Sequence, residues 1–416
     1  LIIFINNCNG YKILYLYKNK MSKPVIVFDN GSGYLKAGLS TDEKPSCTIP
    51  ALIGRPMLRY AEKLEDIELK PLMIGDEVVP VRSLLELTYP MKEGIIENEE
   101  DMAILWDYCI KQKLGVTDDL KDRKFLLTEA PSNPTKNKIK MGEILFEKMG
   151  AGFFNIEPQA KLTIFCEGLE TGLVLDSGDG VTHVIPIAMS CLLHHQISRL
   201  DIAGRHITNY LIKLLQLKGY TFNSTADFET VRELKEKYCF VSCDYEGDQK
   251  LDKETTYYNT IHKLPDGRKI RISNEKFEAT EILFDPNKVD NEQPGVHEMV
   301  FNSINKCAMD VRKSLYESIV LSGASTMFAG YASRIKNEIK NIYIKKNLAD
   351  TTDKKIKINI KIIDSPRRKY SVFSGAAILA NTYNKNESIS YWISKSEWDD
   401  FGSKAIIEKK CQNILR

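Results

Sequence analysis

The chain reads VIVFDNGSG at residues 25–33 and LVLDSGDGVTH at residues 173–183. In each stretch an apolar run, typical of a buried strand, ends in an aspartate that is followed by closely spaced glycines. The two copies lie about 150 positions apart, roughly the length of one domain. The repeat therefore predicts two related lobes, each of which opens with a β-hairpin.

The chemistry of this motif indicates a polyphosphate site. A strand that ends in aspartate delivers a carboxylate to the mouth of a cleft, and glycines let backbone N–H groups approach phosphate oxygens. Two facing hairpins could clamp a polyphosphate, with Asp29 and Asp176 holding Mg²⁺ largely through water and Lys36 placing a charge on the phosphates. The alternative is that these glycines serve only the geometry of the turns.

Length and composition are those of an ordinary globular protein. The chain has 416 residues, a formal charge of +2, 43% hydrophobic and 27% charged residues, which excludes disordered, collagen-like and coiled-coil classes. The near-neutral charge gives no reason to expect nucleic acid as a partner. The sequence has no run of 18 apolar residues, so no membrane span is expected. Nine scattered cysteines are expected to be free thiols.

The first 21 residues are set apart from the fold. The first methionine is Met21, and residues 1–21 have neither the layout of a signal peptide nor that of a transit peptide. We interpret them as a leader that is disordered or is not native to the protein. From residue 22 onward, β-branched apolar runs alternate with helical stretches, which predicts an α/β fold.

The second hairpin motif resembles that of actins and actin-related proteins, and the resemblance extends from Pro24 to Cys411. Further stretches that carry it are LLTEAP at 126–131, RLDIAGR at 199–205, LSGASTMF at 321–328 and RKYSVF at 368–373. The resemblance implies an actin-like ATPase fold with two ribonuclease H-like lobes around a nucleotide cleft. It also implies four subdomains: subdomain 1 (22–50, 90–166 and 371–416), subdomain 2 (51–89), subdomain 3 (167–202 and 293–370) and subdomain 4 (203–292).

The same resemblance implies that the cleft holds ATP or ADP with Mg²⁺. The residues implied at the phosphates are Ser32, Gly33, Tyr34, Lys36, Asp179, Gly180 and Val181. Those implied around the nucleoside are Gly204, Lys235, Glu236, Gly323, Ala324, Met327, Phe328 and Lys369. The hydrated metal would be held by Asp29, Gln159 and Asp176, and the water that attacks ATP would be oriented by Gln159 and His183. The expected activity is at most slow ATP hydrolysis, and the main role is not catalytic.

Four positions depart from the pattern of the family. Pro158 precedes Gln159 and fits the first turn of a helix, but it could change the approach of Gln159. Ala324 replaces a glycine near the nucleotide, Glu93 replaces a histidine near the cleft, and His206 replaces an acidic residue. These departures weaken the assignment of individual site residues without removing it.

Within the family, the segments NPTKN at 133–137, GYTFN at 219–223 and SPRRK at 365–369 are similar to one actin-related subfamily. Its members belong to a seven-subunit complex that nucleates branched actin filaments, in which they act as first subunits of the daughter filament. The implied partners are actin, a second actin-related protein, the other subunits and nucleation-promoting factors, in the cytoplasm and cytoskeleton. A groove for such partners would be lined by Phe165, Gly168, Leu379, Thr382 and Tyr391.

Other functions remain open at this stage. Conventional actin has a mobile apolar loop that grips the next subunit of a filament, whereas residues 59–70 are highly charged here. The main alternative is nevertheless a conventional or divergent actin that forms filaments itself. A sugar-kinase-like phosphotransferase would need an additional catalytic base, and a chromatin-associated relative would be expected to carry large insertions.

Overall fold

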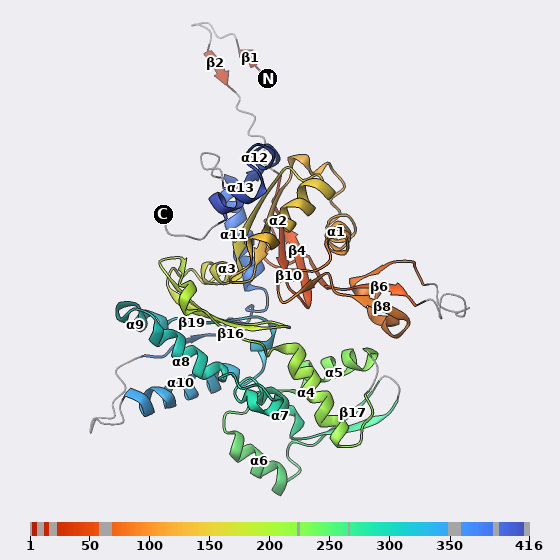
Figure 1. Ribbon diagram of the computed structural model, residues 1–416, viewed down its shortest axis with the longest axis vertical. Coiled ribbons are helices and arrows are strands. Elements are labelled where there is room, and N and C mark those ends of the chain that lie inside the picture. Colours follow the sequence, from red (N-terminus) through yellow and green to blue (C-terminus); the bar gives the residue numbers. More distant parts are fainter. Residues whose placement is uncertain are drawn as a thin grey trace.

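The computed structural model describes residues 2–5, 12–15, 23–57, 69–222, 225–264, 267–347, 359–385 and 391–411. Most of the charged loop at residues 59–70 therefore lies outside the described residues. Within residues 1–21, β1 (Ile2–Ile5) and β2 (Lys12–Tyr15) pair antiparallel with each other and belong to neither large sheet. Figure 1 shows them apart from the body of the molecule. No helix in the described ranges is long and apolar enough to cross a bilayer.

The first lobe contains a six-stranded sheet that begins with the first hairpin. Along the sheet the strands run β21 (Ile393–Ser394), β12 (Phe153–Pro158), β11 (Lys124–Glu129), β3 (Ile26–Asn30), β4 (Tyr34–Leu39) and β5 (Cys47–Pro50). Strands β3, β4 and β5 form an antiparallel meander, and β11 and β12 continue the sheet parallel to β3. All five residues of β3 are buried, because the strand is central and is covered on both faces.

The second lobe repeats this topology. Its sheet runs β15 (Cys191–Leu192), β14 (Thr182–Ala188), β13 (Gly172–Ser177), β19 (Ile319–Ser322) and β20 (Ile362–Ile363), with β16 (Ser198–Leu200) also on β14. The hairpin β13–β14 is antiparallel, and β19 and β20 follow parallel to β13. Both sheets therefore use the same order around their opening hairpins. The prediction of two related lobes in an α/β fold is confirmed.

Helices cover both sheets. In the first lobe these are α1 (Glu99–Tyr108), α2 (Thr135–Glu143), α12 (Lys395–Phe401) and α13 (Ser403–Lys410), with π-helical turns at Cys109–Lys113 and Ile144–Lys148. In the second lobe they are α4 (Gly204–Leu217), α8 (Val296–Lys306), α9 (Met309–Glu317) and α10 (Tyr331–Asn347). Each lobe has its own large apolar core.

Two helices connect the lobes, as Figure 1 shows: α3 (Gln159–Cys166) and α11 (Ser371–Lys385). Ala160 and Ile164 of α3 pack on the second sheet, whereas Phe373 and Ala376 of α11 pack on the first. The helices cross closely at Gly375, where a Cβ atom would lie 2.0 Å from the Leu162 carbonyl oxygen. A side chain at this position would force the crossing apart.

Smaller units extend from each lobe. Beside the first lobe, β6 (Ile53–Pro56), β7 (Met73–Ile74) and β8 (Leu85–Thr88) form a sheet with the 3₁₀ turns η1 (Gly75–Glu77) and η2 (Val79–Leu84). Beside the second lie α5 (Thr225–Tyr238), α6 (Tyr245–Glu254), the hairpin β17 (Thr260–Lys263) with β18 (Lys269–Ile272), and α7 (Glu275–Glu281). The remaining elements are β9 (Met91–Lys92) with β10 (Ile95–Ile96), and the 3₁₀ turns Leu120–Asp122, His194–Gln196, Pro286–Val289 and η8 (Ala324–Met327). The subdomain boundaries stay predictions.

Candidate functional site

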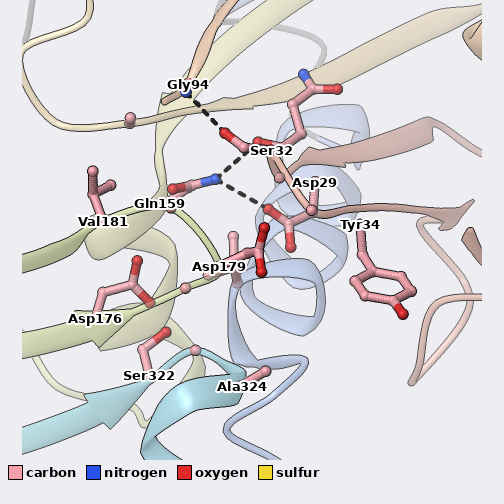
Figure 2. A pocket seen from close by; sticks show the side chains of 18 of the residues that line it. Asp29, Ser32, Tyr34, Gly94, Gln159, Asp176, Asp179, Val181, Ser322 and Ala324 are labelled. Atoms are coloured by element: carbon pink, nitrogen blue, oxygen red, sulfur yellow. Dashed lines mark hydrogen bonds between the residues drawn. The ribbon is translucent and has the colours of Figure 1, made fainter. Parts of the chain in front are cut away.

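The turns of the two hairpins face each other across a cleft between the lobes. A Cβ atom at Gly33, in the β3–β4 turn, would lie 2.7 Å from the Cβ atom of Asp179, in the β13–β14 turn. Figure 2 shows that Asp29, Asp176 and Asp179 point into the same pocket. The motif repeat thus brings two glycine-bearing turns and three carboxylates together, as the sequence predicts.

Asp29 is held at the floor of the cleft by three donors. The Lys36 ammonium lies 2.8 Å from its Oδ2 atom, and the Thr128 hydroxyl donates to Oδ1 at 3.0 Å. The amide of Gln159 donates to the same Oδ1 at 3.3 Å and to the Asn30 carbonyl at 3.3 Å. Lys36, predicted to contact the phosphates, is therefore paired with Asp29 in this structure.

Asp176 ends β13 on the opposite wall. Burial raises the pKa of its carboxyl group, and a hydrogen bond with Ser322 opposes that shift. Gly323 lies beside it with φ +86°, and a Cβ atom there would lie 2.2 Å from the Ser177 carbonyl oxygen. Only glycine fits this close turn. A cation bound near Asp176 would favour the ionised form of its carboxyl group.

The two residues predicted to orient a water molecule both line the cleft, together with Asp29 and Asp176. Gln159 is the first residue of α3, and Pro158 precedes it with φ −65°, so the helix begins normally despite the proline. Burial lowers the pKa of the His183 imidazole to about 4, the charge of Arg199 adds to this, and Asp201 opposes it. His183 is therefore neutral near pH 7.

The second hairpin is anchored to the start of α4. The backbone amides of Gly204 and Arg205 donate to the carbonyls of Gly178 and Asp179 at 3.1 and 2.8 Å. The buried ammonium of Lys235, from α5, donates to the Gly204 carbonyl at 2.8 Å. Burial lowers the pKa of this ammonium group. Gly204 and Lys235 thus hold the β13–β14 turn through hydrogen bonds and do not line the cleft.

The predicted nucleoside residues divide into two groups. Gly323, Ala324 and Lys369 line the cleft, as do all the predicted phosphate residues: Ser32, Gly33, Tyr34, Lys36, Asp179, Gly180 and Val181. The others lie outside the cleft lining as the structure describes it: Gly204, Lys235, Glu236, Met327 and Phe328. Met327 is 39% exposed and ends the 3₁₀ turn that the lining residue Ala324 begins, and Phe328 packs partly against the core. Their roles at the nucleoside stay predictions.

A contact that the sequence analysis did not identify bridges the two lobes near the cleft residue Tyr34. Arg82, in η2, forms an ion pair with Glu229 on α5 and donates to the Tyr89 hydroxyl at 2.9 Å. Arg232 pairs with the same Glu229 at 2.8 Å, and its guanidinium group lies 5.1 Å from the centre of the Tyr34 ring. These contacts join the outer units of the two lobes. Arg82 and Glu229 are 147 positions apart, so no local pattern indicated the pair.

Two of the departures from the family pattern have structural roles. Glu93 adopts φ +52° and lies 2.5 Å from Arg199 of the other lobe, an ion pair at the edge of the cleft. His206 accepts a hydrogen bond from the Ala203 amide through its Nδ1 atom at 3.3 Å, at the start of α4.

The residues of the predicted partner groove differ in exposure. Phe165 is 40% exposed at the end of α3, and Gly168 follows it with φ +69°. On α11, Thr382 is exposed, whereas Leu379 is 7% exposed within the core of the first lobe. Tyr391 stacks on Tyr383 with ring centres 3.9 Å apart. A pocket nearby is lined by the end of α3, by α11 and by residues 40–43, but none of the five predicted groove residues is among its lining residues. The use of this groove by a partner stays a prediction.

Comparisons with known proteins agree with this architecture. A family model described as Actin matches residues 21–412. The chain is 47% identical over 386 residues to Actin-related protein 2 of Schizosaccharomyces pombe, an alignment that covers 93% of the chain and 98% of the relative. It is 47% identical over 396 residues to Actin-related protein 2 of Drosophila melanogaster, covering 94% and 98%. The protein of that name from Saccharomyces cerevisiae is 46% identical over 382 residues, covering 92% and 97%.

Proposed function

The chain belongs to the actin family, and from this premise we propose that it is an ATP-binding structural subunit of the actin-related protein complex that nucleates branched actin filaments. The observation that carries the proposal is the similarity to relatives named Actin-related protein 2, which extends over nearly the whole of both chains. The subunit would act as a first subunit of the daughter filament, in the cytoskeleton. Its partners would be actin, a second actin-related protein, the other subunits and nucleation-promoting factors.

Members of the family bind an adenine nucleotide, and we propose ATP or ADP with Mg²⁺ for this cleft. The facing turns at Gly33 and Asp179 offer backbone N–H groups from both lobes. A ligand that contacts both turns binds the closed cleft better than the open one, so it shifts the population toward closure. The nucleotide would thus stabilise the closed conformation, and this role would not depend on repeated ATP hydrolysis.

The donor set fits a hydrated magnesium ion. Asp29, Asp176 and Gln159 all line the floor of the cleft, and Mg²⁺ prefers carboxylate and other oxygen ligands with several retained waters. When bound, the ion would neutralise charge on the phosphates. Lys36 keeps Asp29 oriented through their 2.8 Å ion pair. Neutral His183 could exchange a hydrogen bond with a water molecule, consistent with at most slow hydrolysis.

The proposal excludes self-assembly into filaments. In actin a mobile loop of one subunit fills the groove of the next, a head-to-tail contact that repeats without closing. In this chain the corresponding stretch carries Glu62, Lys63, Glu65, Asp66, Glu68 and Lys70. Burying even one of these charges unpaired would cost several kcal/mol. The purified chain should therefore remain in the supernatant under salt and Mg·ATP at concentrations where actin pellets. Filaments of the pure protein would favour the conventional-actin alternative.

Nucleotide binding can be tested separately. We expect Mg·ATP to raise the melting temperature of the wild type and to have a much smaller effect on Asp176→Ala. Asp107→Ala is a suitable control, because Asp107 on α1 forms an exposed ion pair with Lys111 of the following π-helical turn and does not line the cleft. Equal stabilisation of Asp176→Ala and the wild type would contradict the assignment of the metal site.

A further inference from the structure

Two buried cysteines face each other in the core of the first lobe, and neither lines the nucleotide cleft. The Sγ atom of Cys47, the first residue of β5, lies 3.8 Å from that of Cys109, where α1 passes into a π-helical turn. Both side chains are buried, Cys47 at 3% and Cys109 at 0% exposure. A disulfide has an S–S bond of about 2 Å, so the sulfur atoms would need to approach by about 1.8 Å.

The two thiols are not equivalent. The hydrogen bond with Cys109 lowers the pKa of the Cys47 thiol, burial opposes this, and the charge of Lys113 adds to it. The pKa of the Cys109 thiol is raised, first by the contact with Cys47 and then by burial. When Cys47 becomes accessible, a thiol with a lowered pKa can be oxidised to a sulfenic acid, and the second thiol beside it can resolve that acid to a disulfide.

A surface ion pair lies near Cys47. Lys113 and Asp76, both close enough to influence the titration of Cys47, form an ion pair with an Nζ–Oδ2 distance of 3.1 Å. The side chains of Lys113 and Asp76 are 33% and 51% exposed. Exposed ion pairs of this kind contribute little stability. Local opening between η1, which carries Asp76, and the π-helical turn would therefore admit a small oxidant.

The position of the pair gives a disulfide a mechanical consequence. Cys47, at the start of β5, lies just before β6 in the chain. Cys109 lies just after α1, the first helix that follows the β6–β8 unit. A bond between them would close a ring that contains β6, β7, β8, η1 and η2. Such a ring mainly restricts the conformations of the enclosed segment when it is unfolded, so local unfolding of the β6–β8 unit becomes less favourable.

We propose that Cys47 and Cys109 are a modification site. Hydrogen peroxide converts this thiol pair reversibly to a disulfide, which links the two ends of the segment that contains the β6–β8 unit. The Cys47 thiolate attacks one peroxide oxygen, the O–O bond breaks, and hydroxide leaves and takes a proton to form water. The Cys109 sulfur then attacks the sulfenic sulfur of Cys47, loses its proton, and displaces hydroxide as a second water. Two thiols and one peroxide thus give one disulfide and two waters, with two electrons passing from sulfur to oxygen. This proposal does not rest on the proposed function.

The test uses the full chain, treated with increasing hydrogen peroxide until the exposed Cys243 is oxidised. Free thiols are then alkylated in denaturant, so that buried cysteines that are still reduced also react, and the peptides are analysed by mass spectrometry without reduction. We expect a peptide pair joined through Cys47 and Cys109, lighter by two hydrogen atoms and released by dithiothreitol. The pair should be lost in Cys47→Ser and in Cys109→Ser but retained in Cys239→Ser, which removes a buried cysteine of the other lobe.

Hydrogen exchange tests the mechanical part. Amide exchange in β6–β8 should slow in the oxidised chain and recover on reduction, while exchange in the second lobe stays unchanged. The proposal is overturned if Cys47 and Cys109 remain fully alkylated once Cys243 is oxidised, or if the linked peptides form only after the chain unfolds. Linked peptides with unchanged amide exchange in β6–β8 would overturn the claim that the disulfide restricts opening of this unit.

Discussion

Closure of the cleft can be tested at Arg82, whose guanidinium group joins the outer units of the two lobes. Its side chain is 6% exposed and pairs with Glu229, which is 15% exposed. The substitution Arg82→Ala removes this cross-cleft pair and the 2.9 Å hydrogen bond to Tyr89. Glu229 keeps its 2.8 Å contact with Arg232 on the same helix, so the carboxylate is not left unpaired. The main loss is therefore the link between the lobes.

The magnitude follows from the kind of contact that is lost. A hydrogen bond to a charged group contributes about 1.5–3 kcal/mol. If this energy favours only the closed cleft, its loss shifts the closed-to-open ratio by a factor of about 10 to 150. We expect nucleotide release from Arg82→Ala to accelerate toward this factor, because the nucleotide leaves through the open state.

The assay is release of a fluorescent ATP analogue after mixing with excess ATP. Arg123→Ala is the matched control, because Arg123 also forms a partly buried ion pair, with Asp118 at 2.9 Å, but within one lobe. Its release rate should equal that of the wild type. Glu229→Gln should accelerate release as Arg82→Ala does, and the double variant should add little. Release from Arg82→Ala within about twofold of the wild type would refute the reasoning, since 1.5 kcal/mol corresponds to about tenfold.

Two further predictions concern stability. Gly375→Ala should lower the free energy of unfolding by about 1–3 kcal/mol in urea titrations, because its methyl group would meet the Leu162 backbone. The control Thr382→Ala, on an exposed face of the same helix, should change the free energy of unfolding by less than about 0.5 kcal/mol. Equal effects of the two substitutions would contradict the close crossing of α3 and α11. The pKa of His183 falls to about 4 on folding, so protonation favours the unfolded chain, and stability is lost as pH falls from about 6.5 toward 4. Between pH 7 and 5 the wild type should lose about 2 kcal/mol more than His183→Gln, and parallel pH profiles would show that His183 is not buried in its neutral form.

The features predicted well from sequence are those that local pattern determines. Asp29 and Asp176 each follow an apolar run and precede closely spaced glycines, so the strand, the turn and the direction of the carboxylate follow from the same few residues. The repeat then predicted that both lobes share one topology. The position of Gln159 at the start of a helix also followed, because proline fits that boundary.

The features that sequence did not predict depend on packing between distant segments. The Arg82–Glu229 pair needs both outer units in place, and nothing near either residue signals the other. Leu379 was placed in the groove by resemblance to the family, yet it is buried because α11 turns that face toward the first sheet. Glu93 gives no sign in the sequence of its left-handed backbone or of Arg199 across the cleft.

The most direct test of the proposed function is to identify the proteins that co-purify with the tagged full-length chain from its own cells. Size exclusion followed by quantitative mass spectrometry would give the composition and stoichiometry of the assembly. The account predicts a discrete complex of seven different subunits, in which this chain and a second actin-related protein are present in equal amounts. Recovery of the chain as self-assembled filaments, or as a monomer without a second actin-related protein, would contradict it.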